Sequence, residues 1–155
     1  MDIVASVLRY VPLPKLTELE VKFPITHDFG RFFPNHPSSL QIPVGDIAHR
    51  LQHLGLYVCA YTDQQDQRFW WKPILPEYAA LPNATYAYQL FRMVELAPNL
   101  RSLAIHSVNI LDIDVLAFPS SLCLRSLYLG GVSISTNILL LLLNKSAERI
   151  RYINF

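Results

Sequence analysis

The sequence predicts one α/β domain built as a solenoid, with a parallel sheet on its concave side and helices and irregular connectors on its convex side. Two observations predict this fold. Five segments share the pattern apolar-x-x-apolar-x-apolar, and segments with the apolar spacing of helices lie between them. One such strand cannot bury its apolar residues alone, whereas stacked copies bury a continuous core, so the recurrence predicts a repeat architecture.

Each copy of the pattern is predicted to form a short strand. The copies begin at Leu16, Leu51, Leu100, Leu124 and Ile150. Side chains alternate along a strand, so the last two apolar residues of a copy point to the same side. The final two intervals are 24 and 26 residues, within the period of about 20–29 residues known for repeats with one strand each. The earlier intervals of 35 and 49 residues are longer, and we expect an irregular insertion at about residues 58–84.

Helical patterns fill the connectors between the later copies. Residues 85–96 carry an apolar stripe, and Asn83 or Thr85 is predicted to cap the resulting helix. Residues 111–118 are less regular, and we expect a short helical turn that begins at Asp112.

Two further helices are expected near the ends of the chain. Ser135 is predicted to cap a helix that contains residues 138–143. Because this helix is apolar almost all round, we expect neighbouring elements to cover it. At the start of the chain, Asp2 is predicted to cap a helix with an apolar stripe of Ile3, Val7 and Leu8.

Composition limits the classes of function. The chain has 155 residues, 52% of them hydrophobic and 16% charged, with a formal net charge of +1. This size suits one domain over residues 1–155, and the low net charge argues against nucleic acid or an anionic membrane as partner. No phosphate loop, metal motif or nucleophile motif occurs, so we predict no cofactor, no metal and no catalysis. Two cysteines and no recognisable signal peptide favour the cytoplasm or the nucleus.

The amino-acid sequence of the repeats resembles that of a known family. Residues 13–21, 97–103 and 124–129 read LPKLTELEV, APNLRSL and LRSLYL, and they are similar to the degenerate leucine-rich repeats of fungal F-box proteins. The resemblance covers nearly the whole chain. It implies a leucine-rich-repeat-like solenoid that recognises the substrate of a ubiquitin-ligase adaptor.

The sequence departs from that family in two ways. Most copies lack the Asn that usually follows the third apolar position, and no helical F-box precedes the first copy. The sequence also stops at Phe155, inside a strand motif and without the polar terminal cap that solenoids need. We therefore expect a fragment that lacks an F-box and a C-terminal cap.

Aligning the copies predicts which outward side chains are neighbours across the strands. Three columns result: Glu18-His53-Ser102-Ser126-Tyr152, Glu20-Gly55-Ala104-Tyr128-Asn154 and Lys22-Tyr57-His106-Gly130. Tyrosine on a rigid strand offers a large amphipathic contact area at little rotamer cost, which is typical of interface anchors. The predicted protein-binding surface on the concave face contains His53, Tyr57, His106, Tyr128 and Tyr152. The alternative interpretation is that these side chains only cover the sheet.

Arginine recurs at one position of three consecutive copies. Arg101, Arg125 and Arg151 are predicted to form a row near the strand starts, and Arg101 and Arg125 are included in the predicted protein-binding surface. Such a row suits an acidic peptide or a phosphate. The competing interpretation is that these arginines pair with acids of the preceding turn or cover apolar atoms with their stems.

The predicted function is non-catalytic protein–protein interaction with an unidentified protein partner. A ubiquitin-ligase scaffold would be bound only through an F-box, which this sequence does not contain. Two alternatives stay open: a truncated or inactive relative, and an enzyme with a pocket on the concave face. The enzyme would require clustered carboxylates, or a Ser–His or Cys–His pair at adjacent repeat positions.

Overall fold

The computed structural model describes residues 2–33, 40–59, 61–62, 68–69 and 85–155. Its elements are α1 (Asp2–Tyr10), β1 (Glu18–Phe23), the 3-10 helix η1 (Thr26–Phe32), α2 (Val44–Ala48), β2 (His53–Val58), β3 (Tyr61–Thr62), β4 (Arg68–Phe69), α4 (Ala87–Glu95), β5 (Ser102–Asp112), β6 (Ser126–Ser133), α5 (Thr136–Ser146) and β7 (Tyr152–Asn154). The fold is α/β. Five strands form one sheet in the order β1-β2-β5-β6-β7.

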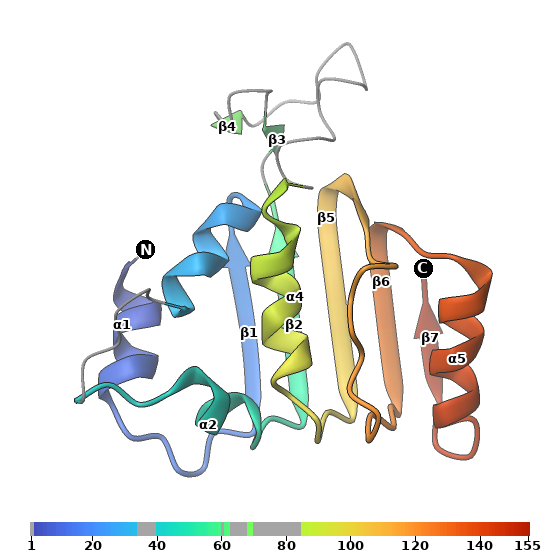
Figure 1. Ribbon diagram of the computed structural model, residues 1–155, viewed down its shortest axis with the longest axis horizontal. Helices are drawn as coiled ribbons and strands as arrows, with labels where there is room; N and C mark the ends of the chain where they lie inside the picture. The colour runs from blue at the N-terminus through green and yellow to red at the C-terminus, as the bar shows by residue number, and fades with distance from the viewer. Residues whose placement is uncertain (1, 34–39, 60, 63–67, 70–84) are drawn as a thin grey trace.

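The sheet contains the five predicted strand segments side by side, in the order of the chain (Figure 1). Every neighbouring pair is parallel, which confirms the predicted pairing. The register aligns the motifs, so the same motif position lies at the same level of each strand. One row across the sheet consists of Leu19, Leu54, Leu103, Leu127 and Ile153.

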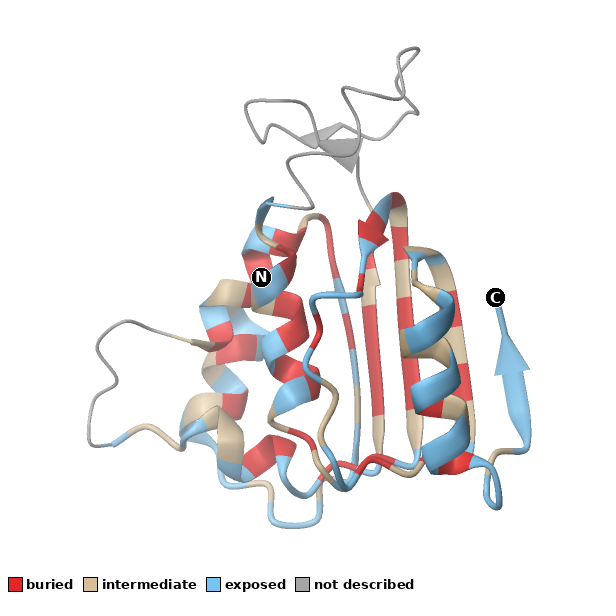
Figure 2. Cartoon of the chain, turned by 45° about the vertical axis from the view of Figure 1, so that its right-hand side comes forward, coloured by how far each residue is buried: buried red, intermediate tan, exposed pale blue. Residues whose placement is uncertain are grey.

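Helices α1, α2, α4 and α5 all lie on one side of the sheet (Figure 1). Apolar residues of β1, β2, β5 and β6 contribute to the core, and burial alternates along β6 (Figure 2). In β6, Leu127 and Leu129 are buried, whereas Tyr128 between them is half-buried. Full burial of one leucine contributes about 2 kcal/mol. The core therefore lies between the sheet and its helices.

One backbone contact recurs where the strands begin. The carbonyl oxygen of Gln52 accepts the N–H groups of Arg101 and Ser102, at 2.8 and 2.9 Å. In the same way, the carbonyl oxygen of each residue that precedes a strand accepts two backbone N–H groups at the start of the next strand of the sheet. These residues form the row Thr17, Gln52, Arg101, Arg125 and Arg151. The backbone positions in this row are thus fixed by the sheet itself.

Helix α4 agrees with the predicted helix at residues 85–96, and Thr85, one of its two predicted caps, is not at the N-cap position. Leu90, Met93 and Val94 of the expected stripe are buried. The helix starts after Tyr86, which makes no side-chain capping hydrogen bond. Thr85 is therefore not the cap, and Asn83 lies outside the described residues.

Helix α5 is capped as predicted, because Ser135 Oγ accepts the Ile138 N–H at 3.4 Å. The expectation that neighbours cover this helix is wrong. Its buried residues are Leu142 and Ser146, while the Leu140 side chain is 50% exposed. The helix packs on the sheet along one side, and no other described helix or strand covers its far side (Figure 1).

Two other local expectations differ from the structure. Helix α1 begins with Asp2 rather than after it. Of the predicted stripe, Leu8 is buried as expected, whereas Ile3 and Val7 are exposed and Ala5 is buried instead. The face toward η1 and α2 decides which residues of α1 are buried, and the sequence alone does not show that face.

The predicted helical turn at Asp112 is present only as a single hydrogen-bonded turn, in which the Ile113 carbonyl oxygen accepts the Leu116 N–H at 3.0 Å. Strand β5 continues to Asp112, whose Oδ1 accepts the Asp114 N–H at 3.0 Å. A side-chain oxygen that binds the N–H two residues later favours a turn over a helix.

The predicted insertion at residues 58–84 is described only in part. There, β3 pairs with β4 in an antiparallel ladder that is separate from the parallel sheet. Across the described part of the chain, none of the helices has the length and apolar content required to cross a membrane.

Candidate binding surface on the open face of the sheet

The side of the sheet opposite the helices carries no other described element (Figure 1), and we call it the open face. The register places its residues as the alignment of the copies predicted. His53 lies opposite Ser102, and Tyr57 lies opposite His106. Because both neighbours of β5 are paired strands, these side chains project from a rigid backbone.

Tyr57, His106 and Tyr128 form an aromatic patch in the middle of the open face. The His106 and Tyr128 rings stack with centroids 6.2 Å apart and planes at 28°. Tyr128 Oη lies 3.5 Å from His106 Nδ1. Gly130 gives these rings room, since a Cβ there would meet both His106 Nδ1 and Tyr128 Oη. The patch is half-buried because its members cover one another.

The Tyr57 ring leans over Gly55, where a Cβ would lie only 2.9 Å from Tyr57 Cε2. Burial raises the pKa of the Tyr57 phenol above its ordinary value of 10.0, and the negative charge of Glu20 and the presence of Tyr128 add to the rise. The patch therefore presents a neutral hydroxyl to a partner at neutral pH.

A cleft of about 690 Å³ hollows the open face where the strands begin, and we call it the strand-start cleft. It brings together four residues of the predicted surface: His53, Arg101, Arg125 and Tyr152. The aromatic patch is the other part of that surface and lies farther along the strands, outside the cleft lining. The predicted residues thus form two adjoining areas of one face.

Arg101, Arg125 and Arg151 line the strand-start cleft as an arginine row. Their backbones occupy consecutive places in the row of strand starts, and neighbouring strands lie about 4.8 Å apart. All three residues are exposed. Among the described residues, none of their guanidinium groups forms an ion pair or a hydrogen bond. Pairing with acids of the preceding turn is therefore not observed in this part of the chain.

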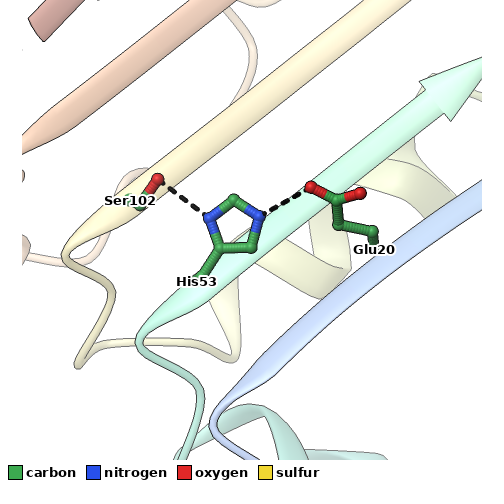
Figure 3. A network of polar contacts seen from close by, with 3 residues as sticks. All are labelled: Glu20, His53 and Ser102. Carbon is green, nitrogen blue, oxygen red and sulfur yellow. Dashed lines mark hydrogen bonds and ion pairs between the residues drawn. The ribbon is translucent and has the colours of Figure 1, made fainter.

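His53 bridges two neighbouring strands in the same cleft (Figure 3). Its Nδ1 lies 2.9 Å from Ser102 Oγ, and its Nε2 lies 3.0 Å from Glu20 Oε1. A carboxylate can only accept, so in neutral His53 the proton lies on Nε2 and Nδ1 accepts the Ser102 hydroxyl. This places a hydroxyl beside a base that a third group orients, which is the arrangement that activates a nucleophile.

The alignment of the copies predicted the Ser102 contact but not the Glu20 contact. His53 and Ser102 stand in one column, so their proximity follows from the register. Glu20 pairs with Gly55 in the register and reaches His53 along a diagonal. A Cβ at Gly55 would lie 2.9 Å from Glu20 Cγ, so the missing side chain opens that route. In the column of Glu20, every other residue has a side chain. Gly55 in that column is therefore the sequence signal that could have revealed the Glu20–His53 contact.

Within the described ranges, no three His, Cys, Asp or Glu side chains are grouped so that they could hold a metal ion. Comparisons of this chain with protein-family models, with curated proteins and with solved structures give no match.

Proposed function

We propose that this chain is a protein-binding module and that the open face of the sheet is its binding surface. The observation that carries the proposal is the aromatic patch, held on adjacent paired strands and covered by no other described helix or strand. Tyrosine and histidine on such a surface combine apolar area with hydrogen-bonding groups. Because the strands fix their positions, little conformational entropy is lost when a partner binds.

The finer part of the proposal is that the sheet lines the concave side of a leucine-rich-repeat-like solenoid. The aligned motifs, the parallel pairing and the helices on one side support it. With the resemblance to fungal F-box proteins, this architecture suggests substrate recognition for a ubiquitin ligase in the cytoplasm or the nucleus. The partner would then be a protein destined for modification.

Affinity purification with mass spectrometry tests the proposal. The tagged chain is compared with a double variant, Tyr128→Ala with Tyr152→Ala, which removes one member of the aromatic patch and the tyrosine of the cleft. Tyr88→Ala is the matched control, because Tyr88 is an exposed tyrosine on α4, on the helical side. Circular dichroism verifies that both variants fold.

We expect specific partners to be lost with the double variant and kept with Tyr88→Ala. Partners that survive removal of both tyrosines would contradict the assignment of the open face.

A second candidate function is ester hydrolysis, and the contacts of His53 with Ser102 and Glu20 favour it. Ser102 Oγ would attack an ester carbonyl, His53 Nδ1 would take the hydroxyl proton and return it to the departing alcohol, and water would then release the acyl group. The N–H groups of Arg101 and Ser102 both donate to the Gln52 carbonyl oxygen, so they are occupied and do not stabilise an oxyanion. This weakens the hydrolytic candidate relative to binding.

A fluorophosphonate probe separates the two candidates. Reaction joins Ser102 Oγ to phosphorus and releases fluoride, with His53 accepting the proton. Labelling that disappears in both Ser102→Ala and His53→Ala, but persists in Ser126→Ala, supports hydrolysis. Absence of labelling in the wild-type chain removes this candidate.

A further inference from the structure

The strand-start cleft carries opposite charges at its two ends. Glu18 and Glu20 line it from β1, and the arginine row lines it from the starts of β5, β6 and β7. Glu18 is exposed, and 61% of the Glu20 side chain is accessible although it contacts His53. The register places Glu18 one residue beyond the level of the arginines and Glu20 two residues farther along β1, so the separation of charge is built into the backbone.

The width of the sheet sets the distance between the two charges. Strand β2 lies between β1 and β5, so Glu18 and Arg101, the first arginine, are two strand spacings apart, about 10 Å. The distance to Arg125 on the next strand is roughly 14 Å. An extended peptide advances about 3.3 Å per residue. About three or four residues of a peptide therefore span the distance between the ends.

We infer that the strand-start cleft binds an extended peptide segment that crosses the strands, with an anionic side chain on the arginine row and a basic side chain on Glu18 and Glu20. This inference rests on the proposed protein-binding function and specifies which sequence the partner presents. The anionic group is a carboxylate or a phosphate, because guanidinium groups bind both through paired hydrogen bonds.

Three features favour a short bipolar peptide over other anions. The arginines have no ion-pair partner among the described residues, so they are available to a ligand. Glu18 and Glu20 would repel the continuation of a long polyanion, which disfavours nucleic acid. Tyr152, 71% exposed beside the row, adds a flat contact area for peptide backbone.

Fluorescence polarisation with synthetic peptides tests the inference. The reference probe is a labelled peptide in which three alanines separate one lysine from one phosphoserine, and a second probe has glutamate in place of phosphoserine. Comparing the two distinguishes phosphate from carboxylate as the preferred anion. In two control peptides, lysine is adjacent to phosphoserine or is replaced by glutamate. We expect both controls to bind at least several-fold more weakly than the reference, and binding to weaken as salt is added.

Variants assign the binding to the cleft. Arg125→Gln is expected to weaken the reference peptide roughly tenfold or more, because it removes the central guanidinium. Glu18→Gln is expected to weaken that peptide and not the peptide that lacks lysine. Arg149→Gln is the matched control, an exposed arginine outside the strand-start cleft.

Equal affinity of the wild type and Arg125→Gln, or of the reference and the adjacent-lysine peptide, would overturn the inference. Failure of the inference is distinguishable from failure of the proposed function. If captured protein partners depend on Tyr128 and Tyr152 but not on Arg125 or Glu18, the open face binds proteins and the bipolar cleft does not select them.

Discussion

Replacement of Gly131 by alanine is expected to destabilise the fold strongly. Gly131 has a φ of 63°, in the left-handed region that other residues seldom adopt. It lies on β6 where β5 takes five residue steps, from His106 to Leu111, while β6 takes two. A Cβ at this position would collide with the carbonyl oxygen of Ser107. Since that oxygen belongs to the backbone, it cannot rotate away as a side chain can.

Two unfavourable terms and one favourable term set the magnitude. Holding alanine in the left-handed region costs about 1–2 kcal/mol. Shifting backbone to relieve the overlap costs roughly 1–3 kcal/mol. The smaller conformational freedom of alanine in the unfolded chain offsets about 0.4–1 kcal/mol. The free energy of unfolding should fall by about 1–5 kcal/mol, which lowers Tm by roughly 2–20 °C in a protein of this size.

Urea denaturation followed by circular dichroism measures this change, with thermal melting as the second readout. Gly45→Ala in α2 is the matched control. There the nearest atom to an added Cβ is Leu96 Cδ2, at an ordinary 3.9 Å. Alanine in a helix is favoured over glycine by up to about 1 kcal/mol, so this control should be neutral or stabilising. An unfolding midpoint of Gly131→Ala equal to that of the wild type would refute the close-approach argument.

Three further predictions concern stability. Leu103→Ala should lower the free energy of unfolding by about 2–5 kcal/mol, because Leu103 is fully buried at the centre of the sheet. Ile110→Ala is the control, since Ile110 is exposed on the same strand, and it should change that free energy by less than roughly 0.5 kcal/mol in the same urea titration. Ser135→Ala should cost about 1 kcal/mol through loss of the α5 cap, and an unchanged melting temperature would count against the cap. The raised pKa of Tyr57 means that the folded state holds the phenol proton more tightly than the unfolded state does; stability from this group is complete below pH 10 and is lost as pH rises above that value. Tyr57→Phe should therefore show a smaller loss of stability between pH 9 and pH 11 than the wild type, and parallel losses would contradict the raised pKa.

The strands and their register could be predicted because their signal is local and repeated. Each motif sets the inward face through alternation with a period of two, and aligned motifs give aligned neighbours. That logic placed Tyr57 opposite His106 and His53 opposite Ser102. The arginine row followed from the same alignment, because a residue that precedes a strand is at a fixed offset from its motif.

Helix coverage and diagonal contacts could not be predicted in this way. Whether the apolar α5 is covered depends on which elements surround it, and Leu140 is exposed because none does so in the described part. The Glu20–His53 contact depends on the absence of a side chain at Gly55, which is a property of three strand positions together rather than of one motif. The charge separation in the cleft likewise depends on β1 and the arginine row lying on the same face, which no single motif shows.

The order of strands in the sheet is the order of their synthesis. As β2 leaves the ribosome, β1 is already available as its template, and each later strand finds its earlier neighbour in the same way. Parallel pairing joins segments that are distant in sequence, and the loops that must close make such folding slow. Growth of the sheet in one direction lessens this difficulty, because each arriving strand has a formed edge to join and few competing edges with which to mispair.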